Sequence, residues 1–195
     1  MDDKNKYIIR EGWISIVANI LLFALKYWAG VVTGSIALIA DAWHTLTDSV
    51  SSVIVLIGGK ISRKPADDDH PFGHGRAEHI AAIIIGVLLA LVAFDFVLGA
   101  IDKFGTREKT TFGTVAWVVT IVSIVVKELM AQYAFWGYKK TNSSILKADA
   151  WHHRTDSLSS IVILVGIIFS NYFWWTDAAL GFIVATMIAY ASYEI

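Results

Sequence analysis

The sequence has no cysteine and few charged residues, which make up 17% of its 195 positions. Without cysteine, neither a disulfide framework nor a thiolate metal site can form, so any bound metal must be held by histidines and carboxylates. The formal net charge of −1 gives no case for nucleic acid as a partner. Residues 1–10 are polar and lack a short apolar region with a cleavage site, so we expect no removable signal peptide.

Hydrophobic residues make up 56% of the chain, which is more than a chain of this length can bury in one core. They gather in six stretches, each near the roughly 20 residues that a bilayer requires. The sequence therefore predicts an all-α membrane protein with six transmembrane helices. The expected spans are Trp13–Val32, Ser35–Ile61, Ile80–Ile101, Phe112–Tyr138, Ile145–Ser170 and Tyr172–Tyr190. The second and fifth carry charges at their centres, so a hydropathy scan should score them weakly.

Basic residues are unevenly divided between the expected loops. The N-terminal segment, the second loop and the fourth loop carry Lys4, Lys6, Arg10, Lys60, Arg63, Lys64, Arg76, Lys139, Lys140 and Lys147. The opposite side has Lys103, Arg107 and Lys109, all in the third loop. Because cytoplasmic loops are enriched in lysine and arginine, we expect both the N- and C-termini to be cytoplasmic.

One sequence motif occurs twice, at residues 41–52 and 149–160. Both copies begin with Asp-Ala-Trp-His, place an aspartate four residues after the histidine and end with Ser-x-Ser-Ser. The copies are separated by an odd number of expected spans, so the second and fifth spans should run in opposite directions. This arrangement predicts a 3+3 inverted repeat with a site near the membrane midplane.

The repeated motif places His44 and Asp48 on one helix face, and His152 and Asp156 on another. Two imidazole nitrogens and two carboxylate oxygens suit tetrahedral zinc, with bonds of about 2.0–2.2 Å. A dication would also neutralise carboxylates that each cost at least about 2.5 kcal/mol at membrane depth. The alternative is that these residues only bridge helices by hydrogen bonds, which does not explain their duplication at ligand spacing. We therefore predict a binding site for a divalent transition metal, most simply Zn²⁺.

Histidine and aspartate bind a metal only when deprotonated, so this site could exchange a metal ion for protons. We expect a secondary transporter and not an enzyme. An ion channel is a rival, although a tight four-ligand shell would slow permeation. An intramembrane metalloenzyme is a second rival, but there is no His-Glu-x-x-His string and no open coordination position. In a third rival, a metal-stapled structural bundle, replacing His44 by alanine would unfold the protein.

The segments Asp41–Ser49, Asp149–Ser157 and His70–Glu78 resemble motifs of the cation diffusion facilitator family, and the resemblance covers essentially the whole chain. It implies a homodimeric metal/proton antiporter that exports metal from the cytoplasm, with the two histidine–aspartate pairs as its transport site. It also implies a multi-pass protein of a plasma membrane, and the short loops suit a bacterial inner membrane. The pairing of His with Asp on both helices resembles zinc-preferring members. Manganese, iron and cadmium remain alternatives, because ligand type separates these metals poorly.

Family members commonly continue into a soluble cytoplasmic domain after the sixth helix. This sequence stops at Ile195, near the end of that expected helix. We therefore expect residues 1–195 to form a single six-helix transmembrane domain without the cytoplasmic domain, either as a short form or as a truncated chain.

A second metal site is expected in the loop after the second span. Asp67, His70 and His74 resemble an interfacial zinc site known in part of the family, and histidine with carboxylate is a plausible partial zinc shell. The alternative is an acidic, solvated loop with surface histidines. Asp41 and Asp149 lie one turn before the site histidines, where each could orient an imidazole or form a hydrogen bond between helices.

Three further ionisable residues fall in the apolar spans. Arg154 needs an anionic partner, for which Asp95 and Glu128 are candidates. Asp95 and Lys127 could each relay protons, although a buried structural ion pair explains an intramembrane charge more simply.

Overall fold

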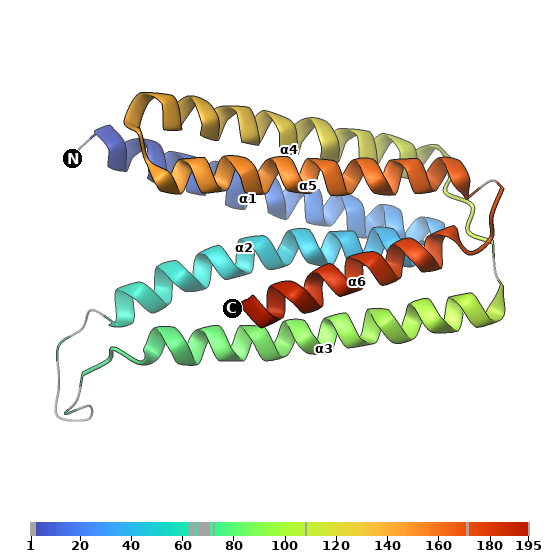
Figure 1. Ribbon diagram of the computed structural model, residues 1–195, viewed down its shortest axis with the longest axis horizontal. Coiled ribbons are helices and arrows are strands. Elements are labelled where there is room, and N and C mark those ends of the chain that lie inside the picture. The colour runs from blue at the N-terminus through green and yellow to red at the C-terminus, as the bar shows by residue number, and fades with distance from the viewer. Residues whose placement is uncertain are drawn as a thin grey trace.

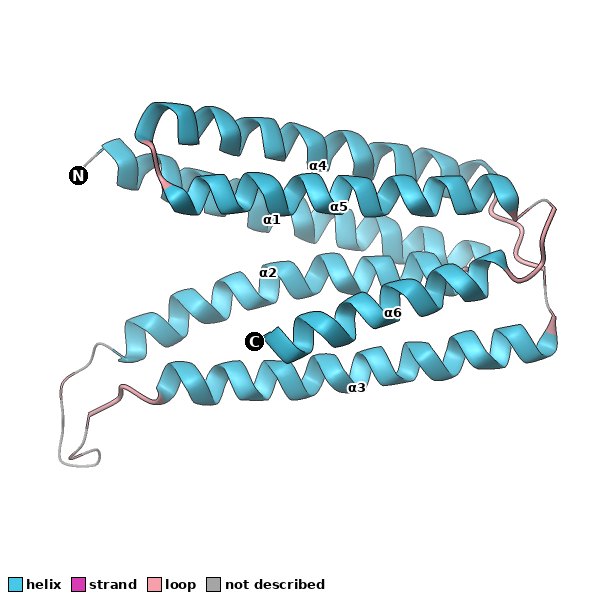
Figure 2. Ribbon diagram, viewed as in Figure 1, coloured by secondary structure: helices cyan, strands magenta, loops and turns pink. Residues whose placement is uncertain are grey.

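A computed structural model describes residues 3–62, 65, 71, 73–107, 109–170 and 172–194. Within these residues the regular structure is helical and comprises six helices, with no strand (Figures 1 and 2). The helices are α1 Asp3–Thr33, α2 Ile36–Ser62, α3 Ala77–Thr106, α4 Gly113–Thr141, α5 Ser144–Phe169 and α6 Thr176–Glu194. Each expected span coincides with one of these helices.

The largest differences from the expected spans are at their ends. α1 begins at Asp3 instead of Trp13, because its polar N-terminal flank continues the helix beyond the apolar part. α6 begins at Thr176 instead of Tyr172, because residues 172–175 belong to the turn that precedes it. Apolar length alone therefore misplaces helix ends, since many polar residues form helix as readily as apolar ones.

The helices form a bundle of closely packed pairs. α1 packs on α2, α3 on α6 and α4 on α5, while α1 also contacts α4, and α2 also contacts α3 and α6. α2 and α5 contact each other only over a short stretch. Alanines are prominent among the fully buried residues, including Ala29, Ala37, Ala40, Ala116, Ala131, Ala134, Ala150 and Ala185. Such small side chains let helix backbones approach closely, which is typical of packing inside membranes.

Chain direction alternates along the bundle. In Figure 1, α2 and α5 run in opposite directions, and both termini lie toward the same end of the bundle as the α2–α3 and α4–α5 connections. This arrangement is compatible with the expected inverted repeat. Which end faces the cytoplasm rests on the loop charges and remains a prediction.

Four helices of the described residues are long and apolar enough to cross a membrane, by length and composition. They are the segments Lys6–Thr33, Ala82–Thr106, Gly113–Thr141 and Thr176–Tyr193. α2 and α5 are the helices that carry the repeated motif and its ionisable residues. Large apolar side chains such as Trp13, Ile83 and Leu91 are more than half exposed at the surface of the bundle, as expected for residues that face lipid.

A buried carboxylate fixes the start of α2. Asp177 in the first turn of α6 is 1% exposed and accepts hydrogen bonds from the side chains of Ser35, Thr110 and Lys103. It also accepts hydrogen bonds from the backbone N–H groups of Ile36 and Ala37. The first backbone N–H groups of a helix have no partner within the helix, so a carboxylate from another helix can satisfy them. We call this group of residues the Asp177 cluster.

Candidate metal-binding site

The two copies of the repeated motif meet where α2 and α5 approach each other. His44 Nε2 lies 3.9 Å from Asp156 Oδ1. His152 Nε2 lies 3.7 Å from Asp48 Oδ2 and 3.6 Å from Asp156 Oδ2. Each histidine therefore faces the aspartate of the opposite helix, and the four residues share one region of the bundle.

Three of these residues could hold one ion without a large rearrangement. One ligand atom each from His44, Asp48 and Asp156 lies within 4.8 Å of the others, and no other group of three in the described part of the chain does so. Ligand atoms around a tetrahedral zinc ion are about 3.3–3.6 Å apart, given bonds of about 2.0–2.2 Å. Small side-chain movements would close this gap. His152 is near enough to both carboxylates to supply the fourth ligand.

Three of the four predicted ligands have largely buried side chains, and the fourth, His152, is more exposed. The side chains of Asp48 and Asp156 are 10% and 7% exposed, whereas that of His152 is 49% exposed. His44 is also buried, and its Nδ1 atom has no hydrogen-bond partner among the described residues. The cluster is therefore not fully enclosed at His152.

α4 adds a cation whose partners the sequence did not specify. Lys127 is 1% exposed, and its Nζ atom donates a hydrogen bond to Asp156 Oδ2 at 2.6 Å and lies 3.6 Å from Asp48 Oδ2. The expected buried ion pair of Lys127 is present, but its partners are the two aspartates of the predicted metal site. A lone lysine in an apolar span signals that it must pair with a carboxylate, yet the sequence does not say which one. We call His44, Asp48, Lys127, His152 and Asp156 the central cluster.

Asp41 forms a bond between helices. Its Oδ2 atom lies 2.8 Å from Lys26 Nζ of α1, and the same ammonium group donates to Thr45 Oγ1 at 3.0 Å. Lys26 and Asp41 are both buried. Of the two roles that we expected for Asp41, this contact corresponds to the bridge between α1 and α2.

Asp149 and His153 face a second polar group on α1. His153 Nε2 lies 3.2 Å from Glu11 Oε1 and 3.0 Å from Ser15 Oγ. Asp149 is half-buried and lies within hydrogen-bonding reach of Glu11. Adjacent residues of a helix point in different directions. His152 therefore lies near the aspartates of the central cluster, whereas His153 lies near Glu11. Glu11, which the sequence analysis did not single out, could have been suspected as a carboxylate at the start of an apolar helix.

The structure confirms an expected partner for Arg154 but not the expected burial of Asp95. Arg154 Nη2 donates to Glu128 Oε1 at 2.8 Å, which confirms Glu128 as one of its two candidate partners. This pair is more than one-third exposed on both sides. Asp95 is exposed on α3, so the expectation of a buried ion pair is wrong for this residue.

The expected loop site lies mostly outside the described residues. Asp67 and His70 are not described, and His74 is half-buried in the turn before α3. The second metal site therefore remains a prediction.

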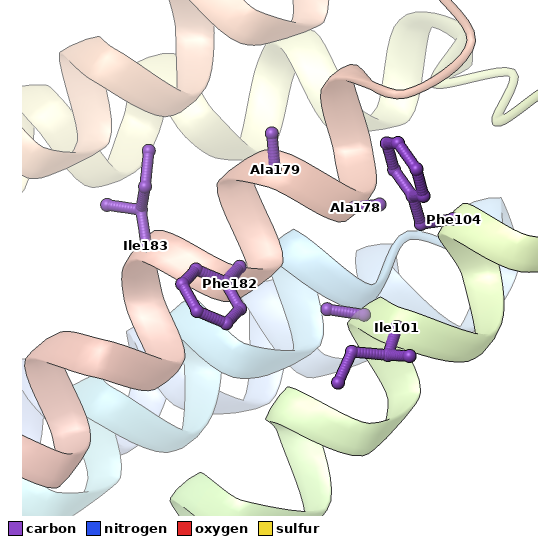
Figure 3. Close-up of a pocket in the computed structure, with 7 residues that line it drawn as sticks. Ile101, Phe104, Ala178, Ala179, Phe182 and Ile183 are labelled. Carbon is purple, nitrogen blue, oxygen red and sulfur yellow. The ribbon is translucent and has the colours of Figure 1, made fainter.

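An apolar groove of about 390 Å³ lies between α3 and α6, away from the central cluster (Figure 3). Its walls are Ala100, Ile101, Phe104, Ala178, Ala179, Phe182 and Ile183. None of these side chains is a metal ligand. The groove is suited to hydrocarbon, and its side chains carry no group that could bind an ion.

Comparison with known proteins agrees with this geometry. The sequence profile described as the cation efflux transmembrane domain matches residues 12–195. The chain belongs to the cation efflux family. This confirms the resemblance to cation diffusion facilitators, and it makes the chain a multi-pass integral membrane protein of the plasma membrane.

Relatives of this cation efflux chain occur in archaea and bacteria. A transporter of Methanocaldococcus jannaschii is 43% identical over 183 residues, which cover 93% of this chain and 65% of the relative. The manganese efflux system protein MneP of Bacillus subtilis is 34% identical, over 93% of this chain and 64% of its own length. The magnetosome protein MamB of Paramagnetospirillum magneticum is 35% identical, over 91% of this chain and 57% of its own length. The chain thus spans less than two-thirds of each of these relatives.

Proposed function

We propose that this chain moves a divalent transition-metal ion out of the cytoplasm through a site between α2 and α5. The observation that carries the proposal is the convergence of both motif copies on one cluster. His44, Asp48 and Asp156 offer ligand atoms within 4.8 Å of one another. His152 lies within 3.7 Å of both carboxylates. Such clusters inside a membrane are expensive to maintain, which favours a functional role over a structural one.

The cargo is exchanged for protons in this proposal. Its four ligands must be deprotonated to hold a metal, and histidine changes its charge near physiological pH. Protons can therefore displace the ion after the site opens to the other side. The partial exposure of His152 supports a site that loads and unloads, in contrast to a closed structural cage.

Two metals are favoured by different observations. Two nitrogen and two oxygen ligands match tetrahedral zinc, which remains our first candidate. Manganese is the second candidate, because MneP and MneS of Bacillus subtilis are manganese efflux system proteins and are 34% and 32% identical to this chain. Imidazole suits zinc and carboxylate suits manganese, so the mixed ligand set is compatible with both.

Metal-resolved uptake into proteoliposomes tests the proposal. The purified chain should take up zinc or manganese in preference to iron and cadmium, with saturable kinetics and a rate that depends on an imposed pH gradient. Asp156→Ala should abolish uptake. Asp95→Asn should not, because it alters an exposed carboxylate of α3 outside the site.

The same experiment separates the rival functions. Flux that does not saturate would indicate a channel, and flux that is indifferent to the pH gradient would reject the exchange for protons. A folded His44→Ala protein that cannot transport supports a transport site, whereas an unfolded one supports a metal-stapled bundle.

We also propose a homodimer, as the family resemblance implies. Light scattering of the detergent-solubilised chain should give the mass of two copies, and a monomeric mass would reject this part of the proposal.

A further inference from the structure

Lys127 places its ammonium group where a metal ion would bind. Its ammonium group donates to Asp156 Oδ2 at 2.6 Å and lies 3.6 Å from Asp48 Oδ2. Its side chain is 1% exposed, so water does not screen this charge. The lysine comes from α4, a third helix, whereas the predicted ligands come from α2 and α5.

The ammonium group and a bound metal ion would compete for the same two carboxylates. Asp156 Oδ2, which accepts the hydrogen bond from Lys127, is also the oxygen nearest to His152. An ammonium group and a dication about 4 Å apart repel each other by several times the thermal energy, even at the effective dielectric constant of a protein. The metal can therefore bind with all its ligands only if the lysine withdraws from Asp156.

We propose that Lys127 is a tethered counter-ion, which neutralises the aspartates of the empty site and is displaced when metal binds. This inference rests on the proposed function, because it requires a metal at the central cluster. Two buried carboxylates would be costly at membrane depth wherever the exchanged protons do not neutralise both of them, so the empty carrier needs this charge in order to return. A compact ammonium group on a flexible four-carbon stem can leave and re-enter without a change of backbone.

The first consequence is that Lys127 weakens metal binding. We expect Lys127→Gln to bind Zn²⁺ or Mn²⁺ at least about tenfold more tightly than the unaltered chain, because a repulsive charge is removed. Equilibrium dialysis of the purified protein in detergent measures this change. An equal or weaker affinity in folded Lys127→Gln would overturn the proposal.

A matched control excludes a general effect of losing a buried ion pair. Lys103 pairs with the buried Asp177, away from the central cluster. Lys103→Gln makes the same substitution there and should leave metal affinity unchanged. If Lys103→Gln tightens binding as much as Lys127→Gln, the effect does not arise from the site and the proposal is wrong.

Lys127→Arg covers the case in which Lys127→Gln does not fold. Arginine keeps the charge and holds carboxylates with a planar, two-pronged fork, so it should be harder to displace. We expect its metal affinity to equal or fall below that of the unaltered chain. Tighter binding would overturn the proposal.

The second consequence separates two kinds of transport. Lys127→Gln should retain exchange of external metal for internal radiolabelled metal, because both directions use the loaded carrier. It should lose most net uptake, at least about tenfold, because the empty carrier returns with uncompensated carboxylates. Equal losses of both activities would contradict the counter-ion role. If the unaltered chain neither binds nor moves metal, the proposed function itself fails, which is distinct from a Lys127 variant that behaves like the unaltered chain.

Discussion

The Asp177 cluster and the central cluster both contain a buried aspartate that pairs with a lysine, but their geometry differs. Asp177 is surrounded by hydroxyl, backbone N–H and ammonium donors at distances up to 3.3 Å. In the central cluster, Asp156 accepts a hydrogen bond from Lys127 at 2.6 Å. The two histidines approach the carboxylates at 3.6–3.9 Å, beyond normal hydrogen-bond distance.

This difference separates a structural cluster from the cluster that we propose binds metal. The oxygens of Asp177 are engaged by donors from Ser35, the start of α2, α3 and the segment before α4, so an added ion would have to break existing bonds. The histidines of the central cluster instead lie 3.6–3.9 Å from the carboxylates, close enough to share an ion with them. Buried polar networks are rigid when they are fully satisfied, so we expect the Asp177 cluster to hold its helices in place.

The largest expected effect is the loss of transport in Asp156→Ala. This substitution removes one ligand and the hydrogen-bond acceptor of Lys127. Because even neighbours of metal ligands often contribute tenfold to 100-fold, we expect metal uptake to fall by more than about 100-fold. Proteoliposome uptake, normalised to protein that elutes as a single folded species, measures this. Residual uptake above about one-tenth would contradict the assignment of Asp156 as a ligand.

Asp177→Ala should produce the opposite pattern. It leaves the Lys103 ammonium group without its carboxylate and exposes the first N–H groups of α2. Breaking a buried pair costs about 3–5 kcal/mol, so the unfolding free energy in detergent should fall by roughly that amount. Uptake per folded molecule should be nearly unchanged. A stable Asp177→Ala protein with impaired transport would remove the distinction between the two clusters.

Gly181→Ala tests how tightly α6 packs beside the Asp177 cluster. A Cβ atom at Gly181 would lie 2.7 Å from Ile36 Cγ2, so α6 or α2 would have to shift. Overpacking of this kind typically costs about 1–3 kcal/mol, which chemical unfolding can measure. Gly12→Ala is the matched control, because a Cβ atom there meets nothing within 4 Å. It should be neutral or stabilise α1 by up to about 1 kcal/mol. Equal stabilities of both variants would show that the packing can relax.

The smallest expected effect is that of Glu128→Gln. Its ion pair with Arg154 lies beside the central cluster in sequence, but both side chains are more than one-third exposed. Exposed pairs contribute about 0–1 kcal/mol, so stability and metal uptake should change little. Thermal unfolding and uptake assays check this. A severe loss of uptake would mean that the central cluster extends to this pair.

The sequence predicted helix positions better than the partners of charged side chains. Apolar stretches located all six helices of the described residues, and the errors lie where polar residues extend a helix or where residues 172–175 turn before α6. The repeat also predicted which residues would gather between α2 and α5. Glu128 was one of two named candidate partners for Arg154, and the sequence did not choose between it and Asp95.

Three features of the charged residues were not predictable in this way. Lys127 lies against Asp156, Glu11 against His153, and Asp177 at the start of α2. In each case the partners are far apart in sequence. Their spacing follows no helical or strand period, because it depends on how whole helices pack.

Local patterns thus suffice to establish a helical membrane protein and the residue types of its duplicated motif, because helix formation and apolar length depend on neighbouring residues. The presence of a cation inside that site, and the carboxylate that anchors α2 from α6, depend on which helices come together. Packing between distant segments determines those contacts, and a single buried charge can be satisfied by any helix that brings an opposite charge within reach.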